Sequence, residues 1–235
     1  MKEVLLLPWY WVLDLLFPPR CALCDRLLSK NETDFCEKCR RIGPDFPCLP
    51  EKEHPNRKTK LQFLDSFTSV WYYKGNVRDS ILKLKFHGRT DLAVPLGRRL
   101  AMCLEQQHPE GFDELTWAPV SPLRRFRRGY DQAQLLAEAV GAELGIKPRK
   151  LLRKRRHNRP QSSLSGEERK GNVLGVYEMH PKYSVKGKHI LLIDDVFTTG
   201  ATAEECARVL LTAGAKRVSC GTLAAAQKQP QNEIC

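Results

Sequence analysis

Two adjacent carboxylates, Asp194 and Asp195, separate an apolar run from a stretch of small hydroxyl residues. The apolar run, 190–193, predicts a buried parallel strand. The stretch from Thr198 to Thr202 leads into a helical pattern. Backbone N–H groups at a helix N-terminus bind phosphate, and carboxylates accept hydrogen bonds from sugar hydroxyls or lie near a bound cation. The segment therefore predicts a site for a phosphorylated sugar.

The turn after the acids has a structural alternative. Gly200 would let the backbone approach a ligand closely, and no lysine stands where a nucleoside-triphosphate P-loop needs one. A capped helix would also explain part of the pattern, because Thr202 and Glu205 have the spacing of a capping box. Capping does not explain two consecutive acids at the carboxyl end of a buried strand, so a ligand site is the favoured interpretation.

The whole stretch, ILLIDDVFTTGAT (190–202), resembles the phosphoribosyl pyrophosphate (PRPP) motif of type I phosphoribosyltransferases. The resemblance implies that Asp194 and Asp195 hold the ribose hydroxyls. It further implies that the loop after them binds the 5′-phosphate, through Thr198, Thr199, Gly200, Ala201 and Thr202. PRPP would be bound together with Mg²⁺.

Basic residues are concentrated in two segments. The net charge is +12, which favours anionic partners. Residues 147–159 hold eight Lys or Arg and no acid, and the segment 124–128 adds four arginines. Such runs are often solvated faces. The alternative is that the two segments form one groove that binds single-stranded DNA.

Four of the nine cysteines form two Cys-x-x-Cys pairs. The pairs are Cys21 with Cys24 and Cys36 with Cys39. This pattern predicts a structural Zn²⁺ site with four thiolates. Disulfides in an exported protein are the alternative, but the rest of the chain reads as a cytoplasmic nucleotide-type enzyme.

The apolar segment 4–17 is too short to span a bilayer, and Pro8 and Asp14 interrupt it. No signal-peptide cleavage pattern follows it. We expect a short helix that packs on the cysteine module, on a partner or on the main domain, with a membrane-surface role as the alternative. No transmembrane segment is predicted.

Strand-like and helix-like patterns alternate after residue 60, which predicts an α/β fold with a mainly parallel sheet flanked by helices. Strands are expected at 67–73, 114–120, 151–155, 173–177, 189–193 and 217–224, and helices at 77–89, 92–107, 132–144 and from about 203 to 213. The predicted organisation is an apolar segment and a four-cysteine zinc module (1–50), a polar linker (51–60) and a phosphoribosyltransferase-like domain (61–235).

Five segments in order resemble the ComF family, and together they extend over nearly the whole chain. They are LLDLLFPPRCALC with the second cysteine pair, YKGNVRDSILKLKFHGR, RRFRRGYDQAQLLA, RPQSSLSGEERKGNV and IDDVFTTGAT. The resemblance places Arg128 near pyrophosphate and Arg159 on a catalytic loop. Lys83 and Lys85 cannot share a helix face, so at most one of them is expected to contact a ligand.

The resemblance implies two functions. The first is transfer of the phosphoribosyl group of PRPP to an unknown acceptor, linked to DNA uptake in natural competence. The second is non-catalytic, PRPP-responsive handling of single-stranded DNA, with a protein of the competence machinery as a further expected partner. Trp9, Tyr10, Trp11 and Tyr130 would be the base-stacking groups, although such aromatics are more often core residues.

Overall fold

The computed structural model describes residues 18–41, 61–155 and 175–226. By its internal contacts the chain divides into two units, 1–42 and 43–235. The N-terminal apolar segment, the linker and the loop 156–172, which carries Arg159, all lie outside the described residues. Among the described residues, no helix combines the length and apolar character needed to cross a bilayer.

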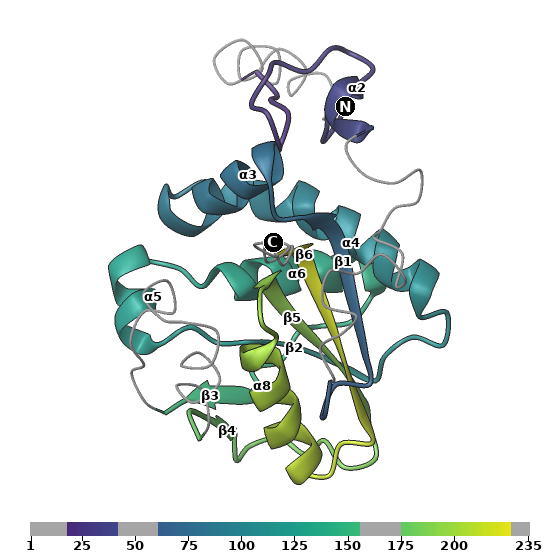
Figure 1. The fold of residues 1–235 in the computed structure, drawn as a ribbon, viewed down its shortest axis with the longest axis vertical. Coiled ribbons are helices and arrows are strands. Elements are labelled where there is room, and N and C mark those ends of the chain that lie inside the picture. The colour runs from purple at the N-terminus through teal and green to yellow at the C-terminus, as the bar shows by residue number, and fades with distance from the viewer. Residues whose placement is uncertain (1–17, 42–60, 156–174, 227–235) are drawn as a thin grey trace, which may run out of the picture. The chain divides into compact units, whose positions relative to one another are not determined.

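The larger unit is built on a four-stranded parallel sheet in the order β1-β6-β5-β2 (Figure 1). Its strands are β1 (Ser66–Tyr72), β2 (Glu114–Trp117), β5 (His189–Phe197) and β6 (Arg217–Ala225). The apolar run of β5, residues 190–193, is fully buried, as expected for a strand covered on both faces. The predicted α/β fold class is confirmed.

Helices cover both faces of this sheet (Figure 1). The helices of the larger unit are α3 (Gly75–Phe86), α4 (Ala93–Gln107), α5 (Pro122–Arg128), α6 (Gln132–Leu144) and α8 (Ala201–Thr212), with the 3₁₀ turn η2 (Thr90–Leu92) before α4. Side chains alternate along a strand. Ile190 and Leu192 pack in the cluster that includes α8, whereas Ile193 lies beside Leu104 of α4.

Strand β2 ends at Trp117, three residues before the end of the predicted strand 114–120, and other expected elements also differ from the structure. The sequence predicts a strand at 173–177, but β4 is Tyr177–Met179 and pairs antiparallel with β3 (Leu152–Lys154) in a separate two-stranded sheet. The arginine-rich segment after β2 is not among the expected helices, yet it contains α5. The start and stop signals of α5 are present in the sequence: Ser121 accepts a hydrogen bond from the Arg124 amide, and Gly129 ends the helix in the left-handed conformation.

The smaller unit places its cysteines close together. Its described residues include one short helix, α2 (Glu37–Arg40), and a bridge between Arg20 and Leu27. The buried residues of this unit are Cys21, Ala22, Leu23, Cys36 and Cys39. Thiols thus make up most of what this unit buries among its described residues.

Candidate functional site

The two acids lie where β5 loses one of its neighbours. Pairing of β5 with β2 stops at Ile193, opposite Trp117, while β5 continues beside β6 as far as Phe197. The acids are therefore part of the strand and do not follow it, in contrast to the sequence-based expectation. Because successive side chains point to opposite faces, Asp194 faces the side of α8 and Asp195 the side of α4 and α6.

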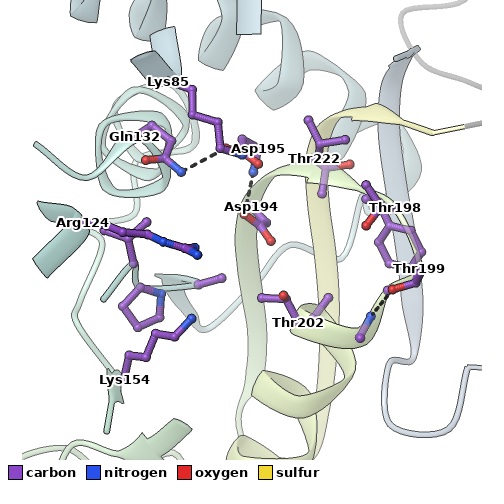
Figure 2. A pocket seen from close by; sticks show the side chains of 18 of the residues that line it. Lys85, Arg124, Gln132, Lys154, Asp194, Asp195, Thr198, Thr199, Thr202 and Thr222 are labelled. Atoms are coloured by element: carbon purple, nitrogen blue, oxygen red, sulfur yellow. Dashed lines mark hydrogen bonds and ion pairs between the residues drawn. The ribbon is translucent and has the colours of Figure 1, made fainter. Parts of the chain in front are cut away.

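Asp195 is the buried end of a polar network from three helices, and Figure 2 shows Lys85 and Gln132 beside it. Lys85 of α3 places its Nζ 2.8 Å from Asp195 Oδ2, and Gln132 of α6 donates to the same oxygen at 3.0 Å. Arg128 of α5 donates in turn to Gln132 at 2.8 Å. Burial alone would raise the pKa of Asp195, but the charge of Lys85 and the donated hydrogen bonds hold that pKa below its usual value.

The pKa of Asp194 is shifted in the opposite direction, above its usual value. Burial and the negative charge of Asp195 raise the pKa of Asp194 to about 7, against the opposing charge of Lys85. Its Oδ1 accepts a hydrogen bond of 2.8 Å from the Asp195 amide. Near neutral pH the ionised carboxylate is therefore under-stabilised by the protein, and sugar hydroxyls or a cation would stabilise it.

The loop after the acids turns tightly into α8. Gly200 has φ of 79°, and a Cβ there would come within 2.5 Å of the Phe197 ring. That ring is itself packed on Phe67, with centroids 3.9 Å apart. Only glycine fits this position, and the turn leaves the N-terminus of α8 beside the acids.

The capping-box interpretation of Thr202 is wrong. Helix α8 begins at Ala201 with Gly200 at its N-cap, so Thr202 lies inside the first turn. Glu205 instead accepts a hydrogen bond from the Gly175 amide and binds Arg208. Glu204, one residue earlier, accepts from the backbone amides of residues 62–64.

These groups converge on one cavity of about 190 Å³. Its lining includes every predicted site residue of the larger unit that the structure describes: Arg128, Asp194, Asp195, Thr198, Thr199, Gly200, Ala201 and Thr202. Lys85 lines it and Lys83 does not, as expected for residues that cannot share a helix face. Arg159 lies outside the described residues.

Several lining residues were not predicted from the sequence. They are Tyr73, Gln132, Lys154, Tyr177 and Thr222. Lys154 is part of the basic run, and its Nζ donates to the Tyr177 hydroxyl at 3.3 Å. Burial and the nearby Arg124 lower its pKa. Arg124 and Lys154 extend toward the space in front of Asp194 and Thr202 (Figure 2), so positive charge faces the loop.

The four cysteines of the smaller unit have the arrangement of a metal site. All four sulfur atoms lie within 4.8 Å of one another, and those of Cys24 and Cys36 are 3.6 Å apart. Zn–S bonds of about 2.3 Å in a tetrahedron separate sulfurs by about 3.8 Å, whereas a disulfide needs about 2.05 Å. The donor set therefore fits structural Zn²⁺, as predicted.

The pKa of Asp194 makes stability depend on pH. The unfolded chain loses this proton near pH 4, but the folded protein keeps it until about pH 7. Raising the pH through this window therefore removes stability. Asp194→Asn should unfold at a higher temperature than the unmodified protein at pH 8, and the difference should shrink as the pH falls toward 4.

Thermal unfolding between pH 4.5 and 8 measures this effect. Asp79→Asn is the control, because its carboxylate is exposed on α3 and should give a pH profile parallel to that of the unmodified protein. Equal unfolding temperatures for Asp194→Asn and the unmodified protein at pH 8 would contradict the raised pKa.

Comparisons with known proteins agree with this geometry. The family model described as "Phosphoribosyl transferase domain" matches residues 127–234, and that described as "Double zinc ribbon domain" matches residues 12–44. Competence protein ComFC of Bacillus subtilis (strain 168) is 32% identical over 206 residues, which cover 86% of this chain and 82% of that protein. DNA utilization protein YhgH of Escherichia coli (strain K12) is 28% identical over 84% of this chain and 86% of that protein.

A third relative is Competence protein F of Haemophilus influenzae (strain ATCC 51907 / DSM 11121 / KW20 / Rd), 25% identical over 88% of this chain and 97% of that protein. Among solved structures, glutamine PRPP amidotransferase from B. subtilis aligns with a TM-score of 0.40 and 20% identity, covering 66% of this chain. The chain spans about a third of the length of that structure.

Proposed function

Because the chain belongs to the ComF family, we propose that it binds PRPP in the cavity around Asp194 and Asp195 and transfers the phosphoribosyl group to an acceptor. The observation that carries this proposal is the pairing of two adjacent acids, Asp195 buried and Asp194 half-buried, with the glycine turn at the start of α8. Sugar hydroxyls and a phosphate need these two kinds of groups side by side.

Different lining residues would bind different parts of PRPP. Asp194 and Asp195 would accept hydrogen bonds from the ribose hydroxyls, and the amides of residues 198–202 would bind the 5′-phosphate. Arg124, Arg128 and Lys154 would contact the pyrophosphate. Mg²⁺, when bound with PRPP, would neutralise part of the pyrophosphate charge.

The proposed reaction is a displacement at C1 of the ribose. A nitrogen nucleophile of the acceptor forms a bond to C1 while the bond from C1 to the pyrophosphate oxygen breaks, and pyrophosphate leaves with the electron pair. The cationic side chains stabilise the charge that develops on this leaving group. Arg159 would add to them from the loop 156–172.

The names of the relatives suggest where this chemistry is used. Two relatives are named as competence proteins and a third as a DNA utilization protein. We propose a cytoplasmic role linked to DNA uptake, with a protein of the competence machinery as partner. The second candidate function is handling of single-stranded DNA without turnover, which the arginines of α5 and the basic residues near β3 favour.

One experiment separates the two functions. Pyrophosphate release from PRPP is measured with a panel of amines, beside binding of single-stranded DNA at two salt concentrations. An enzyme should release pyrophosphate with one of the amines. A DNA-handling protein should bind DNA with an affinity that falls steeply with salt. Charge reversal at Arg155 and Arg156 should then weaken DNA binding and spare PRPP binding, whereas arginines that serve pyrophosphate alone would give the reverse.

A further inference from the structure

A second groove borders the segment that follows β2. It has a volume of about 600 Å³, and its walls come from α5, the turns on either side of α5, and the region of β3. Pro119, Val120 and Lys154 line both this groove and the cavity with the two acids. Its size is in the range of small-molecule sites.

The groove contains an aromatic side chain, Phe126, that is not packed in the hydrophobic core. Helix α5 has no buried residue, and Phe126 on it is 87% exposed, more than any other large hydrophobic residue in the described part of the chain. Phe86 differs, because its ring is covered by the Arg128 guanidinium 4.7 Å away. A bare aromatic face in a groove is suited to stacking against a flat ring.

Two of the cations that line the groove have no acidic partner among the described residues. Within the described residues, no carboxylate forms an ion pair with Arg125 or Lys150, and both line the groove. Arg153 also lines it but is bound to Glu178 at 2.9 Å. One aromatic ring and two uncompensated cations match one base and one phosphate group, whose charge is between about −1.5 and −2 near neutral pH.

The one acid that lines the groove does not cancel this charge at the surface. Asp131 is buried, and its carboxylate accepts hydrogen bonds from the amides of Val120, Ala133 and Gln134. It therefore holds the start of α6 and the segment after β2 in place. The exposed charged side chains of the groove are therefore cationic, and they lie in the same lining as the exposed Phe126.

We propose that this groove binds a nucleoside monophosphate, with the base stacked on Phe126 and the phosphate held by Arg125 and Lys150. The site is additional to the PRPP cavity and does not depend on the function proposed for it. Lys154 lines both pockets, so the two ligands would bind side by side.

Calorimetric titration with adenosine monophosphate tests the site. Phe126→Ala should weaken binding about 5- to 150-fold, the range found when one stacked base loses its aromatic partner. Phe126→Trp should retain it. Leu123→Ala is the matched control, since Leu123 is an exposed apolar residue of the same helix that does not line the groove. PRPP is titrated in parallel and should bind Phe126→Ala unchanged.

Three outcomes would overturn the proposal: no binding of adenosine monophosphate to the unmodified protein, equal affinity in Phe126→Ala and Leu123→Ala, or binding of a decathymidylate strand without the mononucleotide. Failure of PRPP to bind, with nucleotide binding still lost in Phe126→Ala, would overturn only the function proposed for the first cavity.

Discussion

Replacing Asp195 with asparagine is expected to lower the affinity for PRPP with Mg²⁺ by about 5- to 150-fold, since a missing hydrogen bond to a charged group costs about 1–3 kcal/mol. The substitution keeps the shape of the side chain but removes the charge that faces Lys85, 2.8 Å away. It also replaces one of two acceptor oxygens with a donor. Isothermal calorimetry measures the loss directly.

Stability must be separated from binding in this experiment. Removing the charge of Asp195 leaves the partly buried ammonium of Lys85 without its partner, which should itself destabilise the fold. The double variant Lys85→Met/Asp195→Asn removes both charges and should recover folding stability but not PRPP affinity. Asp91→Asn, an exposed acid paired with Arg89, is the control. Unchanged PRPP binding in Asp194→Ala/Asp195→Ala would overturn the PRPP assignment.

Local patterns predict the parts of the fold that depend on near neighbours in sequence. The face of α6 formed by Ala133, Leu136, Ala137 and Val140 is fully buried, as its spacing indicates. Cys206 and Cys220, which lack the Cys-x-x-Cys spacing, are buried core residues. The apolar run of β5 indicates a central parallel strand, because a strand that is covered on both faces is apolar at successive positions.

Contacts between distant segments are not available from one sequence. Asp195 meets Lys85 and Gln132 only because the fold brings α3 and α6 to the same end of β5, across long intervals of chain. Tyr130, a candidate base-stacking group by its sequence context, instead donates its hydroxyl to the Leu84 carbonyl at 2.7 Å. Phe126, a residue that gives no signal in the sequence, is the exposed aromatic.

A run of charged residues in the sequence does not indicate what each of its side chains contacts. Residues 147–159 look uniformly basic, yet Arg149 pairs with Glu114 and Arg153 with Glu178, from positions far along the chain. Lys154 of the same run turns into the cavity. A run of like charges therefore divides among ion pairs, a binding cavity and an exposed groove, and only the three-dimensional structure separates these uses.

Replacing Cys36 with serine is expected to abolish zinc binding and unfold the smaller unit. Residues 18–41, the described part of this unit, bury mainly their own thiols, so zinc is expected to supply much of the stability of this part. Zinc binding contributes about 10–16 kcal/mol in comparable small domains, where it supplies the folding free energy. Elemental analysis should find about one zinc per chain in the unmodified protein and none in Cys36→Ser. Limited proteolysis should cleave the variant within residues 18–41.

The matched control is Cys103→Ala, which removes a buried thiol of α4 that is not part of the cluster. It should retain zinc and resist cleavage in the smaller unit, because the four sulfurs that lie within 4.8 Å of one another are intact. Protein purified under reducing conditions without chelator is the material required. Metal-free protein with disulfides among Cys21, Cys24, Cys36 and Cys39 would contradict the zinc site, since sulfurs that are bonded in pairs cannot serve as four thiolate ligands.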